Sequence, residues 1–114
     1  MQPVITLCGS TKFKNEFLAA ATICGEQGLV VMSLTTFTHA DNVETSPETI
    51  AILEAVHMQK ILMSDSIFVI NKDGYIGEST LREIAFAAVM RKKIKFYEPP
   101  SKTIEDMILT IRHE

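Results

Sequence analysis

Short apolar runs alternate along the chain with longer segments in which apolar positions recur every three or four residues. The runs at 4–8, 29–32, 66–70 and 93–97 are rich in β-branched and other large apolar residues, and we predict a strand in each. Runs that are apolar along most of their length are typical of a parallel sheet buried on both faces.

The segments between these runs predict four helices. Apolar residues at helical spacing run from Phe13 to Cys24, from Ile50 to Ile61 and from Leu81 to Ala88. We predict the fourth helix over Thr103 to Ile111. The second helix has clear start signals, because Thr45 or Ser46 can cap it and the following proline suits its first turn.

Strands and helices therefore alternate four times, which predicts an α/β fold. Right-handed crossovers leave few arrangements, and we favour a Rossmann-like or flavodoxin-like three-layer α/β/α architecture with strand order 2-1-3-4. The parallel sheet would have four strands, or five. The chain shows no internal repeat and no linker, so we expect one domain over residues 1–114.

Composition narrows the class of protein. The 114 residues are 46% hydrophobic and 22% charged, which excludes disordered and low-complexity chains. A net charge of −3 argues against binding to a nucleic acid duplex through a basic surface. Two cysteines are too few for a disulfide scaffold. Neither a signal peptide nor a membrane-spanning run is evident, so we expect a cytoplasmic protein with no membrane partner.

The strand order also predicts where a ligand would bind. With order 2-1-3-4, the crevice lies at the carboxyl ends of the first and third strands, where the loops 8–12 and 71–80 converge. Both loops lead into helix N-termini, which favour anions. The expected ligand-binding residues are Cys8, Gly9, Ser10, Lys12, Asn71, Gly77, Ser79 and Thr80. The alternative for the first loop is ordinary helix capping and a glycine turn. The long polar stretch 33–45 is a second candidate binding loop.

Glu83 and His57 are the candidate catalytic residues. We place Glu83 in the first turn of the third helix, where the helix dipole would keep a nucleophilic carboxylate ionised. The alternative is that Thr80 and Glu83 form a capping box. His57 shares a helix stripe with Leu53 and Ile61, so it is either a buried structural histidine or a proton-transfer group.

A catalytic role for Asp65 and a metal site have weaker support in the sequence. Asp65 precedes the third strand, so we expect it at the opposite, amino end of the sheet, capping the helix-to-strand turn. No paired histidines and no Cys-x-x-Cys motif occur, and we therefore expect no metal and no cofactor.

Three segments together resemble the nucleoside 2-deoxyribosyltransferases and the related 2′-deoxynucleoside 5′-monophosphate N-hydrolases. They are 4–10 (VITLCGS), 64–70 (SDSIFVI) and 77–87 (GESTLREIAFA), and the likeness covers roughly residues 3 to 97. The resemblance implies a Rossmann-like sheet, a homodimer or higher homo-oligomer, and cleavage of an N-glycosidic bond through a covalent deoxyribosyl ester.

The resemblance also implies roles for individual residues. The family's nucleophilic glutamate matches Glu83, and its Gly-Ser after the first strand matches Gly9 and Ser10. Two positions depart from the family pattern. His57 stands where the family usually has an aspartate, and Gly77 stands where it has aspartate or serine.

Two hypotheses follow for function. The first is an enzyme that cleaves or transfers at the N-glycosidic bond of a nucleoside or its 5′-monophosphate, as an N-glycosidase or deoxyribosyltransferase with Glu83 as nucleophile. The second is a non-catalytic nucleotide or nucleotide-sugar binding module that keeps the crevice but has lost turnover with the missing aspartate.

Overall fold

The structure, a computed structural model, describes residues 1–112. Four strands and four helices alternate along the chain, with a short 3₁₀ turn, η1 (Lys72–Gly74), after the third strand. The strands are β1 (Val4–Gly9), β2 (Val30–Met32), β3 (Ser66–Ile70) and β4 (Lys93–Phe96). The helices are α1 (Lys14–Glu26), α2 (Pro47–Leu62), α3 (Glu78–Val89) and α4 (Ile104–Arg112).

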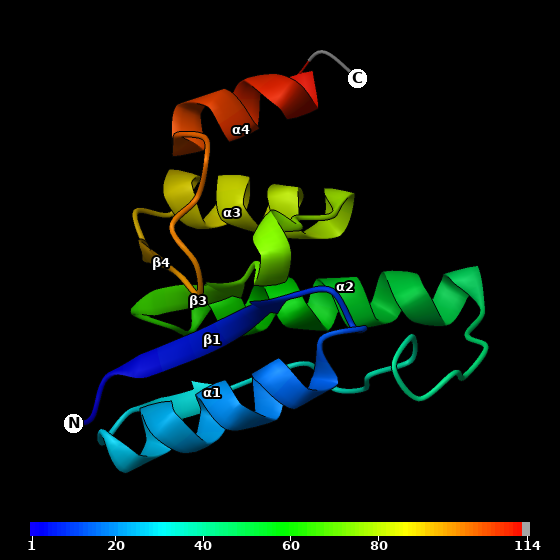
Figure 1. The fold of residues 1–114 in the computed structure, drawn as a ribbon, viewed down its shortest axis with the longest axis horizontal. Helices are drawn as coiled ribbons and strands as arrows, with labels where there is room; N and C mark the ends of the chain where they lie inside the picture. The colour runs from blue at the N-terminus through cyan, green and yellow to red at the C-terminus, as the bar shows by residue number, and fades with distance from the viewer. Residues whose placement is uncertain (113–114) are drawn as a thin grey trace.

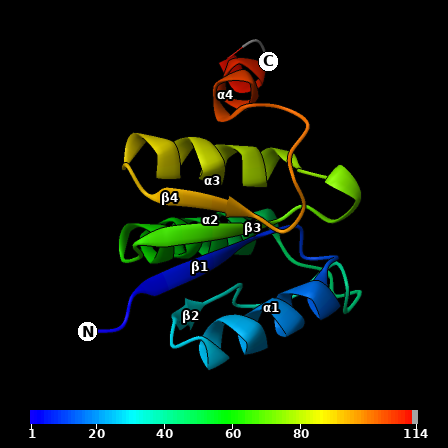
Figure 2. The ribbon, with the colours of Figure 1, turned by 60° about the vertical axis from the view of Figure 1, so that its left-hand side comes forward.

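The strands form one parallel sheet in the order β2-β1-β3-β4, which confirms the predicted fold class and strand order. Figure 1 shows the layers, with α4 outermost, then α3, the sheet, and α1 on the opposite side. Figure 2 shows the strands side by side, with β1 and β3 between the outer strands β2 and β4.

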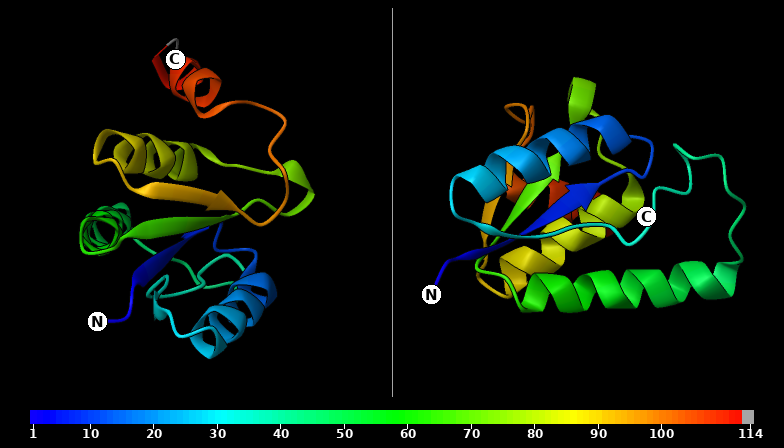
Figure 3. Two further views of the ribbon diagram at one scale, coloured as in Figure 1. Left: turned by 90° about the vertical axis from the view of Figure 1, so that its left-hand side faces the viewer. Right: turned by 90° about the horizontal axis from the view of Figure 1, so that it is seen from below.

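Alternate residues of the central strands pack on opposite faces of the sheet. Cys8, Ile67 and Val69 contribute to a core cluster with residues of α2, α3 and α4. Leu7 and Ile70 pack on the other face against α1. The end-on view in Figure 3 shows the same division, with α2 and α3 on one side of the sheet and α1 on the other.

The outer strands are less buried than their apolar sequences predict. β2 has only three residues, and Val30 is 46% exposed, because the strand lies at the edge of the sheet. β4 alternates exposed Lys93 and Lys95 with half-buried Ile94 and Phe96. The continuous-burial prediction is therefore right for the two central strands and wrong for the two edges.

The amino end of the sheet is held by hydrogen bonds. Asp65 lies there as predicted, but its carboxylate accepts a hydrogen bond from the backbone N–H of Val4, at 2.8 Å. It therefore fixes the start of β1, and it does not cap its own helix-to-strand turn as expected. Within residues 1–112, no helix combines the length and the apolar character needed to cross a membrane.

Candidate functional site

A cavity of about 370 Å³ opens at the carboxyl ends of β1 and β3. The segments that follow β1, β2 and β3 line it, together with the first three turns of α2. In Figure 3 (right), the loop before α2 and the start of that helix reach out beyond the sheet. The cavity lies where the strand order predicts a ligand site.

Three side chains that can act as nucleophile, acid, base or metal ligand meet at the inner end of this cavity. Cys8 comes from β1, His57 from α2 and Glu83 from α3, and they are 0%, 4% and 7% exposed. The His57 Nε2 and Glu83 Oε1 atoms are 3.5 Å apart. The Cys8 Sγ atom and one ligand atom from each of the other two lie within 4.8 Å of one another.

Each of these side chains faces inward because its element packs that way. Cys8 alternates with Leu7 on β1 and therefore faces α2 and α3. His57 lies one helical turn before Ile61, which is fully buried. Glu83 is adjacent to Ile84 in the buried face of α3. The predicted stripe on α2 is thus confirmed, and it places His57 at the cavity.

Several polar atoms of this cluster have no hydrogen-bond partner in the described part of the chain. They are both ring nitrogens of His57 and the Oε1 atom of Glu83. The 3.5 Å contact between the two residues is too long for a good hydrogen bond. Since nearly all buried polar groups in native proteins are hydrogen-bonded, these atoms are available to a ligand.

Burial sets the protonation of the cluster. It lowers the pKa of His57 to about 4, and the nearby Lys60 ammonium adds to this effect, so the imidazole is neutral at pH 7. Burial raises the pKa of Glu83 to about 7, which the Cys8 thiol opposes and the Glu54 carboxylate reinforces. Burial also raises the pKa of the Cys8 thiol. His57 and Glu83 are therefore not an ion pair.

The position of Glu83 in its helix differs from the prediction. α3 begins at Glu78 with Gly77 as its N-cap, so Glu83 lies in the second turn and not the first. No side chain caps this N-terminus, and the predicted alternative of a Thr80–Glu83 capping box is wrong. The Glu83 carboxylate lines the cavity instead.

Five of the eight predicted ligand-binding residues also line the cavity: Gly9, Ser10, Gly77, Ser79 and Thr80. Gly9 has φ +149°, and a Cβ atom there would lie 2.9 Å from the carbonyl oxygen of Ile70. The end of β1 therefore requires glycine, which brings the backbone close to β3. The Ser10 hydroxyl accepts a hydrogen bond from the Lys12 N–H, but no side chain caps α1.

The other three predicted residues lie outside the cavity lining. Lys12 places its ammonium 3.5 Å from the centre of the Tyr75 ring, in a cation–π contact. Asn71 is committed to the backbone of Glu98, to which it donates and from which it accepts a hydrogen bond. Cys8 lies beneath the lining residues, against Glu83.

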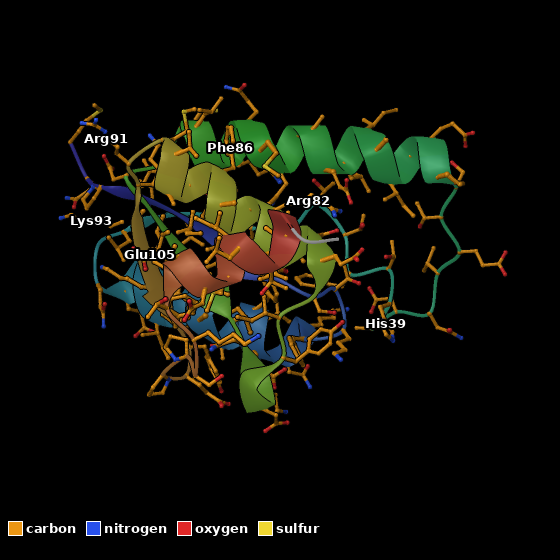
Figure 4. The ribbon with its side chains drawn as sticks, turned by 90° about the horizontal axis from the view of Figure 1, so that it is seen from above. His39, Arg82, Phe86, Arg91, Lys93 and Glu105 are labelled. Atoms are coloured by element: carbon orange, nitrogen blue, oxygen red, sulfur yellow. The ribbon has the colours of Figure 1, made fainter. Side chains whose placement is uncertain are left out.

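Sequence reasoning missed two acidic residues and an aromatic residue of the cavity wall, which are Glu54, Glu78 and Tyr75. Ser79 donates a hydrogen bond to Glu54 Oε1 at 3.0 Å, and Arg82 donates one to the Ser79 hydroxyl. Figure 4 shows Arg82 between α3 and α2. Spacing held a signal for Glu54, since it lies three residues before His57 on the same helix face.

Comparison with known proteins identifies a structural likeness. No protein-family model matches the chain, and no curated protein matches it. A solved structure of the 2-deoxyribosyltransferase from Bacillus psychrosaccharolyticus matches with a TM-score of 0.66 and 19% sequence identity. The match covers 92% of this chain and 79% of the enzyme. The chain therefore has the fold of a 2-deoxyribosyltransferase.

Proposed function

We propose that the protein cleaves or transfers at the N-glycosidic bond of a deoxynucleoside, with Glu83 as nucleophile. One observation carries this proposal: a buried carboxylate with an unbonded oxygen faces a cavity at the carboxyl end of the sheet. The fold shared with a 2-deoxyribosyltransferase makes nucleosides the first substrate class to test. Two of the three sequence segments that resemble this family, 4–10 and 77–87, contribute residues to the cavity wall.

The chemistry can proceed in two balanced steps. The ionised Glu83 carboxylate attacks C1′ of the sugar as the C1′–N bond breaks, and the bond's electron pair leaves with the base, which takes up a proton from solvent. This leaves a deoxyribosyl ester on Glu83. The nitrogen of a second base, or a water oxygen, then attacks C1′, gives up its proton to solvent and releases the carboxylate. We assign neutral His57, whose unpaired Nε2 lies 3.5 Å from Glu83 Oε1, to binding the sugar.

The charge of the cavity favours a substrate without phosphate. Three acidic side chains line it, from Glu54, Glu78 and Glu83, and no lysine or arginine is among the lining residues. A phosphate dianion would be repelled by these groups. Lys12, which the sequence suggested as the cation of an anion site, is held on the Tyr75 ring. We therefore propose an uncharged nucleoside as the substrate.

A second copy of this chain is the proposed partner. The chain exposes 7078 Å², whereas a monomer of its mass exposes roughly 6,200 Å². The excess is close to the roughly 800 Å² that each partner buries in a standard interface. Exposed Ile52 and Val56, one helical turn apart, provide an apolar face on α2, whereas the exposed Ile50 lies on the side of the helix that lines the cavity. We propose that a second copy docks on the Ile52 and Val56 face, beside the cavity.

Base release and base exchange test the catalytic proposal. The full chain is incubated with each of the four deoxynucleosides, with and without a second free base, and the products are separated by chromatography. We expect free or exchanged base with the native chain and with Glu78→Gln, and none with Glu83→Gln. Absence of product above the Glu83→Gln level, for all four substrates, would overturn the proposal.

The same assay with 5′-monophosphates tests the choice of substrate. We expect nucleosides to be the better substrates, by kcat/KM, because the cavity wall is acidic. A preference for monophosphates would contradict the uncharged substrate while leaving the nucleophile in place.

Light scattering after size exclusion tests the partner proposal. We expect the native chain to be a dimer and Ile52→Glu to be a monomer with lower activity, since this side chain is 63% exposed. A monomeric native chain at micromolar concentration would exclude this interface.

The binding-module hypothesis has one observation in its favour. His57 stands where the resembling family has aspartate, and its imidazole is neutral. If no base is released, thermal stabilisation by a nucleoside would identify the protein as a binding module.

A further inference from the structure

We propose that Cys8, His57 and Glu83 form a binding site for one divalent transition-metal ion of the zinc type. The ion would bind at the inner end of the cavity, where the three side chains converge from β1, α2 and α3. This inference goes beyond the proposed glycosyl chemistry and does not depend on it, because an ion can bind without substrate.

The ligand atoms are close to the spacing that such an ion requires. Around a tetrahedral zinc ion, neighbouring sulfur, nitrogen and oxygen ligands lie roughly 3.3–3.6 Å apart. His57 Nε2 and Glu83 Oε1 are already 3.5 Å apart. The full set with Cys8 Sγ lies within 4.8 Å, so side-chain shifts of about 1 Å complete the geometry.

The state of the three side chains supports a missing ligand. Both nitrogens of His57 and one oxygen of Glu83 are buried without a hydrogen-bond partner. A neutral imidazole offers a ring nitrogen that can bind a metal ion directly. The buried Cys24 has no comparable partners in the described chain, since the cluster of possible ligands includes Cys8 alone of the two cysteines.

The donor set indicates the kind of ion. One sulfur, one imidazole nitrogen and one carboxylate oxygen suit zinc, cobalt or copper, whereas magnesium and calcium prefer oxygen ligands only. As the sulfur–metal bond forms, the Cys8 thiol releases its proton to solvent. The thiolate and the Glu83 carboxylate then balance the two positive charges of the ion.

The site would keep an open position toward the cavity. His57 and Glu83 line the cavity, whereas Cys8 lies beneath them. Three protein ligands with a fourth position filled by water or substrate are typical of zinc sites that exchange ligands. An ion there also holds the Glu83 oxygen needed for attack on C1′. On the proposed function, zinc would therefore inhibit glycosyl transfer, and a chelator would restore it.

Cobalt provides a direct test, because a thiolate bound to Co²⁺ gives a charge-transfer absorption band. The full chain is freed of metal with a chelator and titrated with Co²⁺ in the absence of substrate. We expect one ion per chain, the thiolate band, loss of the band when Zn²⁺ is added, and thermal stabilisation by either ion. Failure of the band to form would overturn the metal site without affecting the base-release result.

Matched variants locate the ion. We expect Cys8→Ala and the nearly isosteric Cys8→Ser to abolish the band, and Cys24→Ala to retain it. His57→Ala and Glu83→Gln should weaken Co²⁺ binding at least about tenfold. Co²⁺ binding should be unchanged in the controls His39→Ala and Glu78→Gln, because neither residue belongs to the cluster. His39 lies on the outlying loop (Figure 4). Circular dichroism checks that each variant is folded. A band that survives in folded Cys8→Ser, or that is lost in Cys24→Ala, would contradict the assignment.

Discussion

Two residues of β1 that face the same side of the sheet, Thr6 and Cys8, meet very different surroundings. At the level of Thr6, the buried side-chain polar atoms of the described residues are paired. The Thr6 and Ser64 hydroxyls contact each other, and both lie within hydrogen-bond distance of the carbonyl oxygen of Lys60, so their two protons are shared among these contacts. Two residues further along the strand, Cys8 faces His57 and Glu83, whose buried polar atoms are largely unpaired.

The difference separates paired polar groups, which stabilise the fold, from unpaired polar groups, to which we assign a binding or catalytic role. A paired buried hydroxyl contributes about 0.5–1.5 kcal/mol to stability, whereas an unpaired buried group costs about 1–3 kcal/mol. A folded chain keeps such a costly group where chemistry requires it. We therefore expect substitutions at the amino end to change stability, and substitutions at the carboxyl end to change activity.

The largest expected effect is the loss of activity in Glu83→Gln. Removal of a nucleophile lowers kcat by roughly 10⁴-fold or more. The same change should leave the free energy of unfolding equal or higher, because a buried neutral amide costs less than a buried unpaired carboxylate. Base release and urea denaturation, measured on one preparation, check both halves. A clear loss of stability would show that the carboxylate is a structural group.

The sequence was sufficient to predict the end of the sheet at which the cavity lies. Alternating apolar runs and helical spacing determine the strand order, and the strand order places the crevice. The same helical spacing placed His57 on the buried stripe of α2. These features follow from periodicity, which is a local property of the chain.

The unpaired state of the cluster could not be predicted in this way. The contact of Cys8 with Glu83 joins residues 75 positions apart, and only the crossing of β1 beneath α3 brings them together. The start of α3 was misplaced because Thr80 and Glu83 have the spacing of a capping box, while the helix actually begins at Glu78. Likewise, the charge of Lys12 suggested an anion site, but Tyr75 holds this side chain on its ring.

A smaller effect is expected when the backbone is altered at Gly9, which follows Cys8 at the carboxyl end of β1. In Gly9→Ala, the new Cβ atom would lie 2.9 Å from the Ile70 carbonyl oxygen, on a backbone with φ +149°. We expect a loss of roughly 1–3 kcal/mol in stability together with reduced activity, since Gly9 also lines the cavity.

Gly25 provides the matched control for that change. It lies in α1, and a Cβ atom there meets nothing within 4 Å. Gly25→Ala should therefore raise stability by about 0.5–1 kcal/mol and leave activity unchanged. Thermal melts and the base-release assay compare the two variants. Equal effects from both would show that the close approach of β1 to β3 does not matter.

The smallest expected effect lies at the amino end, where the hydroxyls of Thr6 and Ser64 share the Lys60 carbonyl oxygen. Thr6→Val keeps the shape of the side chain and removes one hydroxyl, so we expect a loss of about 1 kcal/mol. Ser64→Ala should cost a similar amount.

In either single variant the Lys60 carbonyl oxygen keeps one hydroxyl donor, whereas in the double variant it has neither hydroxyl. The double variant should therefore lose more than the sum of the two single losses, as measured by urea denaturation in a double-mutant cycle. Activity per folded molecule should stay at the native level throughout, and a fall in kcat would show that the two ends of β1 are coupled.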